Sequence, residues 1–186
     1  MIVFKNKNEL DYTTHVNIIS RTSKTMLGAI WTGDYITALG KGRFTPMQVI
    51  KLAYMSHGYT LALTDEPLFS DKVEAWKYGP VISSLYHALK KYRNAPIDSL
   101  YACGTRIGSQ ELDKRTSEIR VTIGDSKAGI IQKVVDMYGD HSALELSGGT
   151  HKEGTPWQKV YKKGVQFIEI PNEIIKDYYL KLVKRR

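Results

Sequence analysis

The chain is organised around the stretch Glu74-Ala75-Trp76-Lys77-Tyr78-Gly79-Pro80-Val81, which places two aromatic residues, a charge pair and a Gly-Pro step between two helical patterns. A proline disfavours the helical conformation in the residue before it, and glycine is the residue that this restricts least. The stretch therefore predicts a strand or extended segment that turns sharply at Gly79-Pro80 and leads into a helix. We expect this turn to hold Trp76 and Tyr78 in a fixed position.

The strongest helical pattern lies upstream and begins at Thr45. Thr45 can cap the helix, Pro46 suits its first position, and Gln48 completes a capping box. Apolar residues then recur at steps of three and four, so we expect a central helix with one buried face. Gly58 costs such a helix about 1 kcal/mol relative to alanine, and we expect a close helix crossing to compensate for it.

Shorter elements are expected around this helix. They are a helix over 26–36, a short helix over 84–92, a half-buried strand over 119–123, a helix over 126–138, a short helix over 143–146, a loop over 148–151, a helix from 155, a last strand over 165–170 and a terminal helix from 172. The expected fold class is α+β, mainly α, with a single compact helical domain and a small antiparallel sheet.

Composition narrows the classes of function. The chain has 186 residues, of which 42% are hydrophobic, and no stretch approaches the ~18 consecutive apolar residues of a membrane span. We expect a cytoplasmic protein that does not bind a membrane. The 27 basic and 19 acidic residues give a net charge of +8, which favours nucleic acid, anionic partners or acidic protein surfaces.

Aromatic residues are the first candidates for a binding surface. Trp76, Tyr78, Tyr86, Trp157 and Tyr161 are either core residues or part of an interface, where Trp and Tyr are enriched. Packing of the domain is the stronger alternative for the two tryptophans. Lys77 and Tyr78, at the turn, are the better interface candidates. The candidate partner-binding set is Trp76, Lys77, Tyr78 and Tyr86.

A second group of residues is interpreted as structural, through capping, packing and turn formation. It comprises Glu74, Gly79, Pro80, Thr150, His151, Pro156 and Trp157. His151 with Glu153 nearby would suit general acid–base chemistry, but the sequence specifies no nucleophile or second base. The histidines lack the paired spacing of zinc sites. We therefore expect no catalytic residue, no metal and no cofactor.

Clusters of basic residues occur late in the helical patterns, where cations also favour the negative end of the helix dipole. Solvated helix ends explain them, and an anion-binding surface is the alternative. The candidate anion-binding residues are Lys181, Lys184, Arg185 and Arg186. A nucleic-acid partner is weakly supported, because the chain shows no recognisable recognition helix.

Several separated motifs of this chain match one family together. They are Thr45-Pro46-Met47, Lys51-Leu52-Ala53-Tyr54, His57-Gly58, Leu61-Ala62-Leu63, Pro67-Leu68-Phe69, the stretch Glu74 to Val81, Ser84-Leu85-Tyr86, Leu146-Ser147, Thr150-His151 and Thr155-Pro156-Trp157. Over residues 28–161 the chain resembles the Panacea antitoxin domain, also known as the phage-associated GepA or SocA-like family.

The resemblance implies a non-enzymatic binding module, the antitoxin of a bacterial or prophage toxin–antitoxin pair, which neutralises its toxin by direct contact. Some relatives are similar to proteolytic adaptors that deliver a toxin to a protease. The alternatives are a phage counter-defence protein that binds a host defence protein, and a nucleic-acid-associated regulator. Residues 1–25 are expected to be an N-terminal extension packed on or flanking the core, and residues 26–186 a Panacea-like domain with a basic C-terminal helix.

Overall fold

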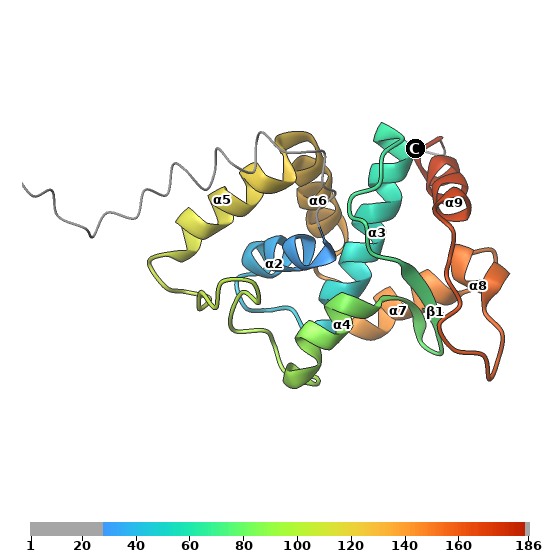
Figure 1. Ribbon diagram of the computed structural model, residues 1–186, viewed down its shortest axis with the longest axis horizontal. Coiled ribbons are helices and arrows are strands. Elements are labelled where there is room, and N and C mark those ends of the chain that lie inside the picture. The colour runs from blue at the N-terminus through green and yellow to red at the C-terminus, as the bar shows by residue number, and fades with distance from the viewer. Residues whose placement is uncertain (1–27, 185–186) are drawn as a thin grey trace, which may run out of the picture.

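Helix α3 (Pro46–Thr64) is the axis of the structure, a computed structural model that describes residues 28–184 (Figure 1). The predicted capping box is present, because the side chain of Gln48 accepts from the backbone N–H of Thr45 at 3.0 Å. Pro46 occupies the first turn, where its missing N–H costs nothing. Every residue from position 49 to position 61 is buried, so α3 is a core helix with neighbours on all sides and not the helix with one buried face that the apolar spacing predicted.

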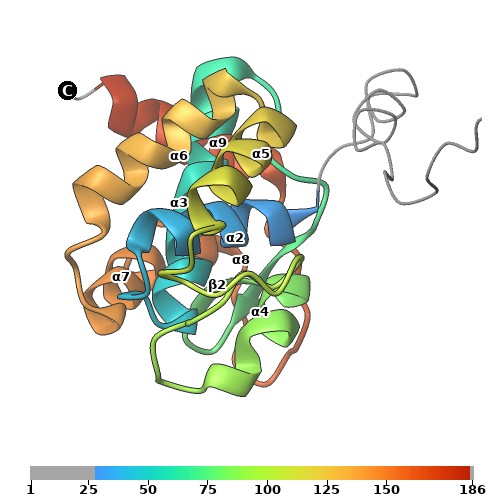
Figure 2. The ribbon, with the colours of Figure 1, turned by 90° about the vertical axis from the view of Figure 1, so that its left-hand side faces the viewer.

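The other elements of the described residues surround α3. They are α2 (Ala29–Gly40), β1 (Val73–Trp76), β2 (Gly79–Ile82), α4 (Ser83–Leu89), the short 3-10 helix η1 (Lys90–Tyr92), α5 (Leu112–Ile123), α6 (Asp125–Tyr138), α7 (Ala143–His151), α8 (Pro156–Val160) and α9 (Asn172–Lys184). Helix α2 crosses α3 and contacts α5 and α6, whereas α7 and α9 cover other faces of α3 (Figure 2). The predicted fold class, mainly α with a small antiparallel sheet, is confirmed.

The sheet is a single hairpin in which β1 and β2 pair antiparallel, from Val73 opposite Ile82 to Trp76 opposite Gly79. The predicted turn at Gly79-Pro80 is therefore misplaced, because the chain reverses at Lys77 and Tyr78. Gly79, with a φ of 104°, is the first residue of β2 and closes this two-residue turn. β2 leads directly into α4, as the predicted order of extended segment and helix requires.

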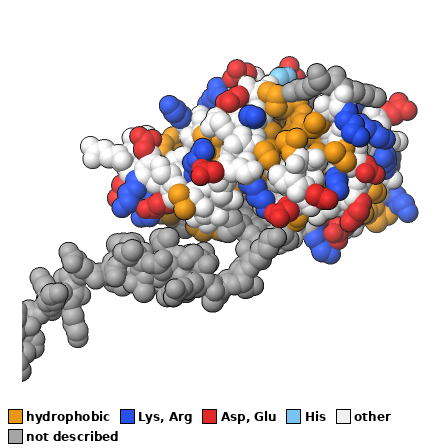
Figure 3. Space-filling model, turned by 90° about the horizontal axis from the view of Figure 1, so that it is seen from above, with side chains coloured by type: hydrophobic (Ala, Val, Ile, Leu, Met, Phe, Trp, Pro, Cys, Tyr) orange, Lys and Arg blue, Asp and Glu red, His pale blue; other side chains and the backbone are white. Residues whose placement is uncertain are grey.

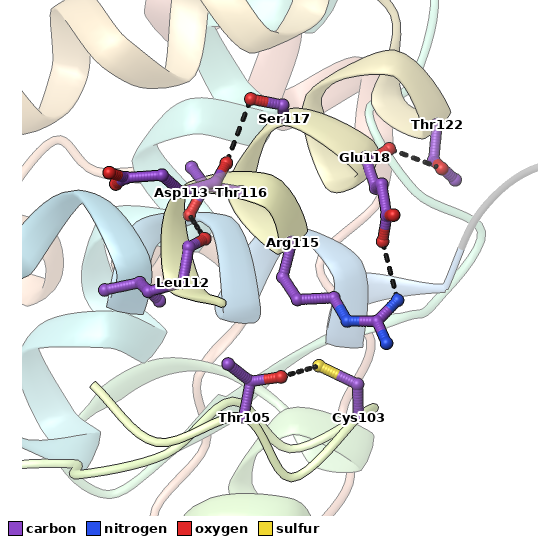
Figure 4. Close-up of polar contacts among 9 residues, drawn as sticks. All are labelled: Cys103, Thr105, Leu112, Asp113, Arg115, Thr116, Ser117, Glu118 and Thr122. Carbon is purple, nitrogen blue, oxygen red and sulfur yellow. Dashed lines mark hydrogen bonds and ion pairs between the residues drawn. The ribbon is translucent and has the colours of Figure 1, made fainter. Parts of the chain in front are cut away.

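Residues 119–123, predicted as a strand, belong to helix α5. The exposed fraction of Val121 is 73%, whereas Leu112, Ile119 and Ile123 are buried on one helical face. Alternation over only five residues does not distinguish the two-residue period of a strand from the 3.6-residue period of a helix. Hydroxyl groups along the helix donate to backbone carbonyls four residues earlier, as Figure 4 shows for Thr116, Ser117 and Thr122.

Two further predictions of local structure were wrong. Residues 148–151, predicted as a loop, form the last turn of α7, because a capping box of Ser142 and Glu145 starts the helix and its buried face continues through Thr150. The last strand, predicted over 165–170, is reduced to one bridge between Glu74 and Glu169. Two backbone hydrogen bonds hold it: Ala75 N–H to the carbonyl of Ile168 and Ile170 N–H to that of Val73, both 2.8 Å.

Helix α9 completes the core by crossing α3 closely. A Cβ atom on Gly58 would lie 2.2 Å from the ring of Tyr179, so the predicted close helix crossing at Gly58 is confirmed. At the start of α9, the side-chain oxygen of Asn172 accepts from Nε2 of His57 at 2.8 Å. Burial lowers the pKa of His57 to about 4, so this contact joins two neutral groups at physiological pH.

Two predicted features fall on residues that the structure does not describe. The predicted N-terminal extension, residues 1–25, and the terminal Arg185 and Arg186 lie outside residues 28–184. Within residues 28–184, no helix combines the length and the apolar character that crossing a membrane requires.

Candidate protein-binding surface

The backbone of the hairpin turn is held by side chains from two helices. Nζ of Lys51, on α3, donates to the carbonyl oxygens of Tyr78 at 2.9 Å and Pro80 at 3.0 Å. The hydroxyl of Ser147, on α7, donates to the same Tyr78 carbonyl at 2.9 Å. The turn is therefore held by hydrogen bonds to its main-chain carbonyls, and the Tyr78 side chain takes no part in these bonds.

Lys51 carries out this role from inside the core. Its exposed fraction is 1%, and burial lowers the pKa of its ammonium group to about 7. Gly79 makes room for the ammonium, since a Cβ atom there would lie 2.6 Å from Nζ. The positive φ of Gly79 independently disfavours any other residue.

A third contact to the hairpin comes from α8. Thr155 caps this helix and Pro156 begins it, which places Trp157 under β1. Nε1 of Trp157 donates to the carbonyl oxygen of Trp76 at 2.7 Å. The buried Trp157 ring also stacks on Tyr161, with ring centroids 4.3 Å apart. Trp157 therefore has a structural role: it packs on Tyr161 and binds the backbone of β1.

Trp76 stands at the centre of a second aromatic group and is only partly buried. Its Nε1 donates to a carboxylate oxygen of Glu74 at 2.7 Å, so Glu74 fixes the orientation of the indole. The rings of Tyr86 and Phe167 meet Trp76 edge to face, with centroid distances of 4.9 and 6.5 Å. The structure thus brings together two predicted interface residues, Trp76 and Tyr86, and adds Phe167.

Lys77 and Tyr78 form the tip of the hairpin and are both exposed. The exposed fraction of Tyr78 is 60%, and Nζ of Lys77 lies 5.2 Å from the centre of its ring. They occupy the turn itself, because the pairing of β1 with β2 ends at Trp76 and Gly79.

A groove runs beside this tip, between the hairpin and the chain that follows α8. Its volume is about 630 Å³. It is lined by Ala75, Trp76, Lys77, Tyr161, Lys163, Gly164, Val165, Gln166 and Phe167, and we call it the hairpin groove. Phe167 has a φ of 58° and an exposed fraction of 66%. A bulky residue in this conformation is a strained outlier of the kind that clusters at binding sites.

The motif at the end of α7 is engaged in local hydrogen bonds. The Thr150 hydroxyl donates to the carbonyl oxygens of Leu146 and Ser147, at 2.9 and 3.0 Å. Nδ1 of His151 donates to the carbonyl of Ser147 at 2.5 Å, and its ring meets Trp157 edge to face. Both residues lie against β2, since a Cβ atom on Gly79 would be 3.4 Å from Thr150 Oγ1 and from His151 Cβ. Among the described residues, no cluster of His, Cys, Asp or Glu is arranged to hold a metal ion.

The predicted anion-binding residues lie elsewhere. Lys181 and Lys184 are exposed in the last turn of α9, which ends far from the hairpin tip in Figure 1. Hydrophobic side chains also gather over the ends of α3, α6 and α9 (Figure 3). The groove there, about 740 Å³, carries acidic Asp125 and Asp136 beside basic Lys133, so it has no single sign of charge.

Sequence reasoning missed several residues of the site. Lys51 is the only charged residue between positions 46 and 64, and a lone charge in an apolar helix was a signal that could have marked it. Ser147 stands in the family motif Leu146-Ser147, but nothing in the sequence indicated its contact with the hairpin, and Lys163 and Phe167 gave no signal. They join the hairpin only because distant segments of the chain meet there.

The fold and this surface define a small, mainly helical domain that presents a rigid aromatic hairpin to solvent. The family described as "Antitoxin SocA-like, Panacea domain" matches residues 49–158, which is more than half of the chain. The chain therefore belongs to this family, and its resemblance to the Panacea domain is confirmed. Searches of curated proteins and of solved structures gave no match.

Proposed function

We propose that this protein is a non-enzymatic antitoxin that neutralises a cognate protein toxin by binding it directly. Membership of an antitoxin-like family supports a protein partner in general. The observation that carries the proposal further is the hairpin tip, whose side chains face solvent while its backbone is fixed from within. The tip supplies contact area without having to be ordered on binding.

The chemistry of the tip suits a protein interface. Tyrosine and tryptophan provide large apolar contact area with a polar group at the end, and they are enriched among residues that dominate binding energy. Tyr78 projects from the turn, and Trp76 with Tyr86 lies beside it. Because three hydrogen bonds fix the carbonyls of Tyr78 and Pro80, little conformational entropy is lost when a partner binds.

The test is co-expression of the full chain with the product of each flanking gene. Growth rescue and a stoichiometric complex on purification are the expected results for the cognate toxin. Tyr78→Ala removes exposed contact area and leaves the carbonyl contacts of the turn in place, so we expect weaker rescue with unchanged folding. A loss of about 2 kcal/mol, or roughly thirtyfold in affinity, is typical of a hot-spot tyrosine.

Tyr101→Ala is the matched control. Tyr101 has an exposed fraction of 52% and lies on a loop anchored by Asp34 of α2, away from the hairpin. It should leave rescue unchanged. Failure of every flanking gene product to bind the full chain, with no relief of toxicity, would contradict the antitoxin proposal. Capture of a host defence protein in place of a toxin would favour a phage counter-defence role.

A further inference from the structure

The charged residues that line the hairpin groove, Lys77 and Lys163, are both positive. Lys77 comes from the turn and Lys163 from the chain after α8, and the lining contains neither aspartate nor glutamate. Neither lysine forms an ion pair with another residue of the described chain. Two uncompensated ammonium groups therefore flank a largely apolar wall of Trp76, Val165 and Phe167.

Two lysines beside an apolar wall favour a ligand that carries both carboxylates and an apolar group. A carboxylate near each lysine would gain from charge-assisted hydrogen bonds, and an apolar side chain between them would cover the exposed wall. We propose that the hairpin groove binds an acidic segment of the protein partner, with carboxylates at Lys77 and Lys163 and an apolar side chain against Trp76 and Phe167. The inference rests on the proposed function, whose partner it specifies chemically.

Charge complementarity distinguishes this occupant from other segments of protein. Residues 1–27 of this chain contain four basic residues and two acidic ones, and a second copy of the chain carries a net charge of +8. Both carry a net positive charge, so net repulsion from the two lysines would oppose their binding. An acidic partner segment has the opposite sign, and long-range attraction would also raise its rate of association.

The aromatic geometry disfavours a nucleic acid. Single strands bind by laying bases parallel on exposed aromatic faces along a positively charged groove. Here Tyr86 and Phe167 meet Trp76 at interplanar angles of 63° and 84°, which builds an edge-to-face wall.

Fluorescence anisotropy with the full chain tests the inference. The probe is a labelled synthetic peptide in which a Leu-Phe pair is flanked by glutamates. Matched probes replace the glutamates by lysines, replace Leu-Phe by Ala-Ala, or substitute a labelled oligo-dT strand. We expect the acidic, apolar peptide to bind best and its affinity to fall as sodium chloride is raised.

Charge-reversal variants locate the binding. The double variant Lys77→Glu with Lys163→Glu should weaken the acidic peptide by about tenfold or more, because attraction becomes repulsion. The double variant Lys114→Glu with Lys133→Glu, at exposed positions of α5 and α6 that do not line the groove, makes the same change of charge and should have a much smaller effect. Circular dichroism and thermal melting of each variant confirm that the fold is retained.

The outcomes separate this inference from the proposed function. Four results would each overturn the inference: no binding of the acidic peptide, equal binding of the lysine peptide, preference for oligo-dT, or equal effects of the control double variant at Lys114 and Lys133 and the groove double variant. Toxin neutralisation by the full chain would still support the antitoxin role in those cases. Conversely, selective peptide binding at the groove would stand even if no flanking gene encoded a toxin.

Discussion

At the scale of single residues, Lys51 does the most to define the surface. A buried ammonium group costs free energy unless hydrogen bonds replace its water, and Lys51 has two such bonds, both to carbonyls of the hairpin. Burial explains why its pKa falls to about 7 from an ordinary value of 10.5. The orientation of the turn is therefore linked to a buried titratable group.

Stability should depend on pH through Lys51. Between about pH 7 and pH 10.5 the unfolded chain binds this proton and the folded protein releases it, so raising the pH favours the folded state. The slope approaches about 1.4 kcal/mol per pH unit. Below about pH 7 both states are protonated and this contribution becomes constant. Urea unfolding at several pH values measures the slope.

Lys51→Met isolates this effect from other titrations. The variant should lack the rise in unfolding free energy between pH 7 and pH 10, while Lys114→Met, at an exposed position of α5, should keep it. If the unfolding free energies of the wild type and Lys51→Met changed with pH in parallel, the pKa of Lys51 would not be lowered by burial, and the prediction would be wrong.

At the scale of elements, the long periodic segments were predictable and the short ones were not. The apolar spacing and the capping box of α3 predict a helix from local sequence alone. The apolar spacing of α6 and α9 predicts those two helices in the same way. In contrast, β2 contains Gly79 and Pro80, which local preference excludes from a strand interior. The hairpin forms because β1 and helices α3 and α7 contact β2 from different sides.

Gly58 illustrates how element packing overrides local preference. Alanine is the better helix former by about 1 kcal/mol, yet Gly58→Ala should lower the unfolding free energy by about 1–3 kcal/mol, because its Cβ would overlap the ring of Tyr179. Gly129→Ala in α6 is the control, since no atom lies within 4 Å of the added Cβ. It should stabilise the protein by about 0.5–1 kcal/mol.

Denaturant unfolding of both glycine variants tests whether packing against α9 outweighs helix propensity at Gly58. Equal effects of the two substitutions would show that helix propensity dominates and that α9 does not press on α3 at this position. A destabilised Gly58→Ala with a stabilised Gly129→Ala would establish the close crossing.

At the scale of the whole molecule, the domain extends beyond the part that matches the family. The match covers residues 49–158, but α2 and α9 lie outside it and both pack on α3. Ile175 and Tyr179 of α9 are buried, and the Tyr179 ring meets Tyr59 at a centroid distance of 4.8 Å. These flanking helices complete the core on which the hairpin rests.

Removing α9 should therefore abolish cooperative folding. Loss of a large buried side chain costs about 2–5 kcal/mol, and deleting α9 removes both Ile175 and Tyr179 from a domain whose total stability is of order 5–15 kcal/mol. A chain ending at Ile170 should lose its sharp thermal transition. A chain ending at Lys184 keeps both residues and should melt as the full chain does. A cooperative transition in the shorter chain would contradict the assignment of α9 to the core.

The sequence by itself determined the mainly helical class, the central helix, the close crossing at Gly58 and the family, because these depend on periodicity, caps and motifs written along the chain. Only the tertiary structure decided how the surface is built. Lys51, Ser147 and Trp157 meet the hairpin carbonyls from three helices far apart in sequence. A local pattern can mark Lys51 as unusual, but it cannot show which distant backbone groups these side chains contact, since the contacts arise from packing of the whole core.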